Sequence, residues 1–187
     1  LLYRSRWQAS SVRARAPFVG RDGERAALET ALGALGRARG GAIGISGEAG
    51  LGKSRLVHDL VPGGDTSAPY KTAFAAATAL GRSIPYHALA SALRDLLGIA
   101  DGDDGARISS VVNAVLGELD PGLSSDAPFF VSLMSLSSAT PEWLAMDPRR
   151  KREAARDAFL RLARAAAAKQ PLAFVFDALD GRVARWR

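Results

Sequence analysis

The chain has 187 residues, of which 48% are hydrophobic, and a formal net charge of +6. This length supports one domain with a substantial core. The sequence has no cysteine, which excludes disulfides and thiolate metal sites, and no apolar run approaches the ~20 residues that cross a bilayer. We therefore expect a cytoplasmic protein without membrane contact.

Both ends of the chain are basic and show no regular period. Residues 1–16 precede Pro17 and are interpreted as a linker or the end of a preceding domain, and residues 181–187 as an irregular basic tail. Scattered arginines of this kind are typical of a solvated tail, so a nucleic-acid partner is not expected for this segment.

The first regular elements follow Pro17. Apolar residues at helical spacing predict a helix that begins at Asp22, with acidic residues in its first turn, and stops near Gly40. The short apolar run Ala42–Ser46 predicts a buried parallel strand. A further helix is predicted over Lys53–Leu60, where Pro62 ends it.

The loop between this strand and this helix matches the phosphate-binding pattern G-x-x-x-x-G-K-[ST] at every fixed position. Its residues are Gly47, Glu48, Ala49, Gly50, Leu51, Gly52, Lys53 and Ser54. The glycines free the backbone to point successive N–H groups at a phosphate, at the positive end of the following helix. Lys53 is the expected charge for the β- and γ-phosphates, and Ser54 the expected hydroxyl ligand of Mg²⁺. The loop predicts nucleotide binding.

The roles of Glu48, inside the loop, and Arg55, directly after it, need separate consideration. A carboxylate near phosphates is costly, so we expect Glu48 to point to solvent. Arg55 either helps to neutralise phosphate or faces a nearby acid, and the sequence does not decide between them.

The middle of the chain is predicted to be rich in helices. Residues 70–80 favour a second strand by their aromatic and threonine content, although their alanines also suit a helix. Asp101–Gly105 is an acidic loop without calcium-loop spacing and is interpreted as a solvated turn. Helical patterns cover residues 88–97, 108–119, 129–136 and 149–168.

An apolar run that ends in an acid closes the predicted fold. Leu172–Asp177 follows the breaker Pro171 and predicts a buried strand with a carboxylate at its C-terminal edge, a Walker B candidate. His58 and His87 have no visible metal partner and are interpreted as structural or surface residues. The alternation of strands and helices predicts an α/β fold with a parallel sheet.

The order of these features resembles the ATPase module of STAND-type signalling proteins. That module is the AAA-like P-loop domain found beside class III adenylyl and guanylyl cyclases and in large LuxR-type transcriptional regulators. The residues that carry the resemblance are Phe18-Val19-Gly20-Arg21 with Glu24, the phosphate loop, Pro85-Tyr86-His87, and Pro171 to Asp177.

The resemblance covers residues 17–180 as a partial P-loop ATPase domain. It implies a three-layer α/β/α P-loop NTPase fold with an α-rich insertion before Walker B. It also implies that Val19, Gly20 and Arg21 lie near the adenine of ATP, and that Asp177 lies near Mg²⁺.

Two departures from the family pattern bear on activity. The family usually has two adjacent acids after this strand, whereas this chain reads Asp177-Ala178-Leu179-Asp180. Ala178 then stands where a group would polarise the attacking water, so weak or absent hydrolysis is a hypothesis. The chain also ends ten residues after Asp177. The resemblance therefore implies that C-terminal strands and sensor residues are missing, as in a fragment of a larger regulator.

The leading functional hypothesis is an ATP-binding regulatory switch domain of a signalling or transcriptional regulator, with or without ATP hydrolysis. Its partners would be ATP, Mg²⁺ and the effector domains of a longer parent protein. One alternative is a P-loop small-molecule or nucleoside kinase. The other is a non-catalytic fragment with a vestigial nucleotide site.

Overall fold

A computed structural model describes most of the chain between the two basic ends. The described residues are 20–35, 37, 40–48, 50–61, 69–77, 86–135 and 138–178. The predicted linker 1–16 and tail 181–187 lie outside them. Within the described residues, no helix combines the length and the apolar character needed to cross a membrane.

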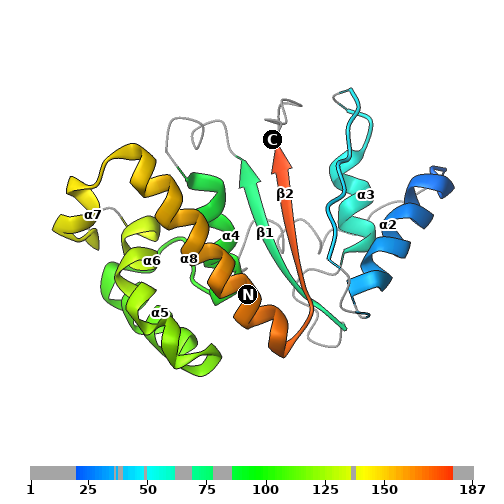
Figure 1. Cartoon of the computed structure of the whole chain (residues 1–187). Coiled ribbons are helices and arrows are strands. Elements are labelled where there is room, and N and C mark those ends of the chain that lie inside the picture. The colour runs from blue at the N-terminus through cyan, green and yellow to red at the C-terminus, as the bar shows by residue number, and fades with distance from the viewer. Residues whose placement is uncertain are drawn as a thin grey trace.

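Helices dominate the chain and alternate with two strands (Figure 1). In chain order the elements are α2 Asp22–Leu35, α3 Lys53–Leu60, β1 Lys71–Ala77, α4 His87–Leu97, α5 Gly105–Leu119, the 3₁₀ helix η2 Pro121–Asp126, α6 Ala127–Met134, α7 Pro141–Ala145, α8 Pro148–Lys169 and β2 Leu172–Ala178. The predicted helices are confirmed to within a few residues at their ends. The sequence patterns did not predict the short helices η2 and α7.

The two strands form a parallel sheet. Register runs from Lys71 opposite Leu172 to Ala77 opposite Ala178. The strands predicted on either side of the helical region are thus confirmed, and the alanines of β1 do not make it a helix. Because parallel neighbours need a long crossover, the helices α4 to α8 all lie in the connection between them.

The strand predicted over Ala42–Ser46 is wrong. These residues have no regular secondary structure, and Ile43 is 50% exposed where burial was expected. The physical reason is that a strand is stabilised by its ladder, and within the described residues β1 and β2 pair only with each other. Gly44 in the middle of the run weakens strand formation further.

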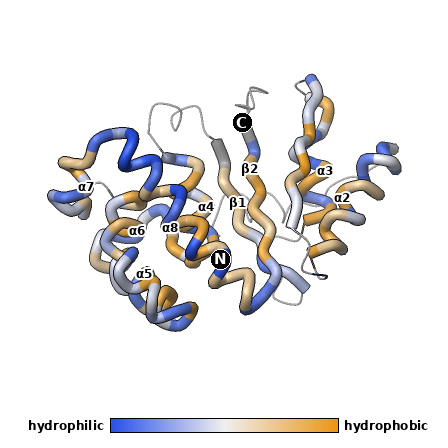
Figure 2. The backbone as a smooth tube through the Cα atoms, in the orientation of Figure 1, coloured by the Kyte–Doolittle hydropathy of each residue, from blue (hydrophilic) through white to orange (hydrophobic). Residues whose placement is uncertain are grey.

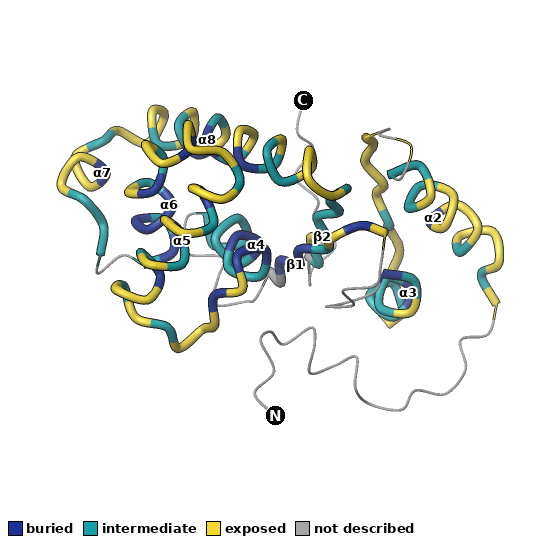
Figure 3. The backbone as a smooth tube through the Cα atoms, turned by 90° about the horizontal axis from the view of Figure 1, so that it is seen from below, coloured by how far each residue is buried: buried dark blue, intermediate teal, exposed yellow. Residues whose placement is uncertain are grey.

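Helices cover both faces of β2. Phe174 packs on Phe159 of α8 with ring centroids 4.9 Å apart, whereas Asp177 hydrogen-bonds to Ser54 of α3. Residues three apart in a strand point to opposite faces, so α8 and α3 lie on opposite sides of the sheet. Figure 3 shows α4 to α8 on the β1 side of the two strands and α2 with α3 on the β2 side. The predicted parallel α/β arrangement is confirmed, with two strands in the described part.

Helix α4 protects the outer edge of β1. The backbone N–H of Phe74 donates to Asp95 Oδ2 at 2.8 Å, so a side chain takes the place of a neighbouring strand. The neighbouring residue Arg94 connects α4 to α6. It donates to the carbonyls of Ala100 and Met134, each at 2.8 Å. Gly98 then ends α4 in the left-handed conformation.

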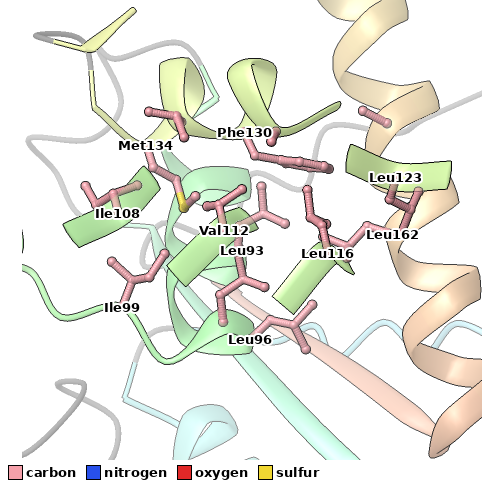
Figure 4. Close-up of a cluster of buried hydrophobic side chains, with 14 of the residues drawn as sticks. Leu93, Leu96, Ile99, Ile108, Val112, Leu116, Leu123, Phe130, Met134 and Leu162 are labelled. Carbon is pink, nitrogen blue, oxygen red and sulfur yellow. The ribbon is translucent and has the colours of Figure 1, made fainter. Parts of the chain in front are cut away.

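The core lies between α4, α5, α6, α8 and the sheet (Figure 4). Its members are apolar residues at helical spacing, which is why the sequence pattern located these helices. Among those with no exposed surface are Leu93, Val112, Leu116, Phe130 and Leu162. Figure 2 shows that hydrophobic residues recur along the backbone of these helices and of both strands. The candidate site lies away from this core, where α3 meets the end of β2.

Candidate functional site

The glycine-rich loop before α3 contains three glycines with positive φ. Gly47, Gly50 and Gly52 have φ of 155°, 83° and 77°. At Gly50 and Gly52 the backbone is left-handed, a conformation that strains residues with a side chain. The sequence therefore places glycine where this turn requires it.

The N-terminus of α3 follows directly on the glycine-rich loop. The helix begins at Lys53, and the carbonyl of Gly52 accepts from the N–H of Leu56 at 2.9 Å. Among the described residues no side chain caps this end, and the first turn has no acidic residue. Because the helix dipole concentrates positive charge here, an anion is the ligand that suits this end.

Lys53 folds back over the loop. Its ammonium donates to the carbonyls of Gly47 at 2.9 Å and Glu48 at 2.8 Å. An ammonium has three donors, so this geometry leaves one for a further acceptor. The loop thus holds a fixed cation beside the free end of α3.

Ser54 and Asp177 meet although they are 123 residues apart in sequence. Ser54 Oγ donates to Asp177 Oδ1 at 3.2 Å, and the contact is partly buried. It joins the first turn of α3 to the C-terminal end of β2, so the two predicted Mg²⁺ ligands lie side by side. A hydroxyl and a carboxylate are hard oxygen donors of the kind that Mg²⁺ prefers.

A family model described as the AAA ATPase domain matches residues 17–186. The chain belongs to this family. Neither the curated proteins nor the solved structures contain a match to the sequence. Membership confirms the AAA-type P-loop module that the sequence predicted, and it supports nucleotide binding, typically with Mg²⁺.

The upstream segment of this AAA ATPase domain is strained. Gly20 and Arg21 have φ of 80° and 61°, and the carbonyl of Arg21 then accepts from the N–H of Arg25 at 2.9 Å as α2 begins. A left-handed conformation at a residue such as arginine costs about 1–2 kcal/mol. Such strain is concentrated at functional sites, and here it falls on Arg21, one of the three residues predicted near adenine.

The remaining predicted site residues are placed as follows. Glu48 is exposed, as expected, and Leu51 is 48% exposed at the tip of the loop. Arg55 is half-buried in α3. Val19 and Ala49 lie outside the described residues, as does Asp180.

The AAA ATPase domain offers metal ions few protein ligands. Within the described residues, no group of three or more His, Cys, Asp or Glu side chains could hold a metal. His58 and His87 are half-buried, in α3 and at the start of α4. A cation at Ser54 and Asp177 would therefore take its other ligands from water and from a bound phosphate.

Sequence reasoning missed the strain at Arg21 and the hydrogen bonds of Lys53. Residue identity alone carries no signal for a positive φ at arginine, because most arginines avoid it. The carbonyl partners of Lys53 follow from the turn of the loop rather than from any side chain.

Proposed function

We propose that this AAA ATPase domain binds ATP with Mg²⁺ and acts as a regulatory switch. The observation that carries the proposal is the hydrogen bond between Ser54 and Asp177, beside the ammonium of Lys53. It brings the ligands expected for phosphate and for magnesium to one point of the fold. A chance glycine turn would not be expected to meet a carboxylate from a strand so distant in sequence.

Each residue has a separate task in the proposed complex. The N–H groups at the start of α3 and the ammonium of Lys53 bind the phosphates. Ser54 and Asp177 would hold the metal through their oxygen atoms. Mg²⁺ would neutralise charge on the β- and γ-phosphates. Gly20 and Arg21, with Val19, would contact the base.

Hydrolysis is proposed to be slow. Asp177 has Ala178 as its neighbour, so the second acid that would polarise a water is replaced by a methyl group. A site that binds but hydrolyses slowly suits a switch, because occupancy rather than turnover sets the state.

The switch would work through the contact between α3 and β2. Binding of nucleotide and metal would replace the hydrogen bond between Ser54 and Asp177. The distance between α3 and β2 would change as a result. We infer that the output is conformational, towards effector domains of a STAND-type parent protein in a signalling or transcriptional pathway.

Binding of a fluorescent ATP analogue tests the proposal. The full chain is expected to bind it in the micromolar range with Mg²⁺, and Lys53→Ala is expected to weaken binding at least about tenfold because a charged phosphate contact is lost. Lys71→Ala, which removes the same charge from the exposed first residue of β1, is the matched control. Equal affinity of the two variants would refute the site.

The metal ligands have their own readout. Mg²⁺ should tighten nucleotide binding in the wild type, and Ser54→Ala or Asp177→Asn should remove most of that gain. Phosphate release at ordinary ATPase rates would overturn the proposal of slow hydrolysis while leaving binding intact.

A further inference from the structure

Helix α8 concentrates the positive charge of the chain. Over Pro148–Lys169 it carries eight basic and two acidic residues, so its formal charge of +6 equals that of the whole chain. Figure 2 shows the hydrophilic stretch that begins at its N-terminus. The rest of the sequence has a formal net charge of zero.

Four of these basic residues lie on one exposed side of the helix. The buried residues of α8 are Ala155, Ala158 and Leu162. The exposed positions that recur at helical spacing form what we name the outer face of α8: Arg149, Arg152, Arg156, Leu160 and Arg164. Figure 3 shows this side of α8 at the margin of the molecule, away from the sheet.

Part of the charge pattern opposes the stability of the helix. Arg149 to Arg152 form four consecutive cations in the first turn, where the helix dipole disfavours positive charge. Arg152 and Arg156 are like charges four residues apart, an arrangement that is also destabilising. Asp147, which accepts from the N–H groups of Arg149 and Arg150, offsets part of this cost. A costly pattern on an exposed face points to a use outside the fold.

Among the residues that the structure describes, two arginines of the outer face have no internal counter-ion. Arg149 pairs with Glu153 at 3.0 Å and Arg156 with Asp157 at 2.9 Å. Arg152 and Arg164, by contrast, have no carboxylate partner in the part of the chain that the structure describes.

An apolar side chain lies between these two arginines. Leu160 is 40% exposed, one turn before Arg164 and two turns after Arg152. Arg156 lies one turn before it, so the leucine is bordered by guanidinium groups along the axis of the helix.

We propose that the outer face of α8 docks an acidic protein segment that carries an apolar side chain at its centre. Guanidinium groups bind carboxylates in bidentate geometry, and arginine around an apolar centre is the usual composition of protein interfaces. A partner helix with a carboxylate every fourth residue repeats about every 6 Å. Arg152 and Arg156 lie one such repeat apart, and Arg156 and Arg164 lie two repeats apart with Leu160 between them.

Leu160 favours a protein over a nucleic acid. A phosphate backbone gives a leucine nothing to pack against, and the outer face has no aromatic side chain on which bases could stack. Phe159, the aromatic residue of α8, packs on Phe174 instead. The surface is independent of the proposed nucleotide site, since none of its residues belongs to the loop or to Asp177.

Fluorescence anisotropy with two labelled probes tests the proposal on the full chain. One probe is a synthetic helical peptide of about 15 residues, with glutamate at every fourth position and one central leucine; the other is a DNA duplex of about 20 base pairs. At about 50 mM salt the peptide is expected to bind more tightly than the duplex. Arg164→Glu should weaken peptide binding at least about tenfold, and Leu160→Ala about threefold.

Arg107→Glu is the matched control. Arg107 is an exposed arginine in the first turn of α5, also without a carboxylate partner in the described part of the chain, so the substitution changes net charge equally. It should leave peptide affinity within about twofold of the wild type. Equal losses from Arg164→Glu and Arg107→Glu would show a general charge effect and overturn the surface. So would tighter binding of the duplex together with no effect of Leu160→Ala, or no peptide binding by a chain that still melts cooperatively.

Discussion

Leu162 provides the sharpest test of how α8 is attached to the rest of the molecule. Its side chain has no exposed surface and belongs to the core shared by α4, α5, α6 and the sheet. Leu162→Ala removes three carbons at about 0.8 kcal/mol for each buried CH₂, which gives about 2.4 kcal/mol. The cavity that remains adds to this, so we expect a loss of about 3–4 kcal/mol in the free energy of unfolding.

Leu160→Ala is the control for this substitution. It makes the same chemical change on the same helix two residues earlier, so the change in helix propensity cancels. Because Leu160 is 40% exposed, its truncation should cost less than about 1 kcal/mol. The comparison therefore isolates burial.

Urea denaturation followed by circular dichroism measures both variants. With unchanged m-values, Leu162→Ala should lower the midpoint far more than Leu160→Ala, and Tm should fall by roughly 6–12 °C. Losses that agree to within about 0.5 kcal/mol would refute the packing of α8 described above.

Two further predictions concern side chains that accept backbone hydrogen bonds. Asp95→Ala removes the acceptor of the Phe74 N–H, so we expect a loss of about 1–3 kcal/mol in urea denaturation; Asp95→Asn, which keeps an oxygen, should recover much of it. At the start of α8, the pKa of Asp147 is lowered below its ordinary 3.8, mainly by the hydrogen bond from the backbone N–H of Arg150 and further by that from Arg149. The carboxylate therefore stabilises the fold above that pH, and its contribution is lost as pH falls through the lowered pKa. The Tm advantage of the wild type over Asp147→Ala should be constant near pH 6 and shrink below about pH 4.

Each of these has a contradicting outcome. Asp95→Asn that is as unstable as Asp95→Ala would show that the carboxylate charge, rather than the acceptor, protects the edge of β1. A Tm difference for Asp147→Ala that does not change between about pH 6 and pH 3 would mean that the ionised form is not the one that caps α8.

Local signals predicted those parts of the fold that short-range physics decides. The bounds of Lys53–Leu60 were predicted because the loop pattern marks the start of the helix and Pro62 follows its end. Gly98 marked the end of α4 in the same way. Helices η2 and α7 were missed because five or six residues are too few to show a helical period.

The strand predicted over Ala42–Ser46 failed for a different reason. An apolar run indicates that burial is favourable, but a strand also needs a neighbouring strand to pair with. Whether such a partner is present depends on residues elsewhere in the chain. In the candidate site, too, local sequence identifies the residues but not the contacts between them. The pattern identified Lys53, Ser54 and Asp177 one by one, whereas the contact between Ser54 and Asp177 depends on topology.

The pairing of β1 with β2 has a consequence for synthesis of the chain. Residue Lys71 pairs with Leu172, so about a hundred residues must be made before the sheet can close. At roughly 5–20 residues per second, β1 waits about 5–20 s on the ribosome for its partner, while the helices between them can already assemble. Its exposed edge is a target for chaperones or for misassembly during that interval. The carboxylate of Asp177 reaches Ser54 only at the end of this wait, so the candidate site is completed last.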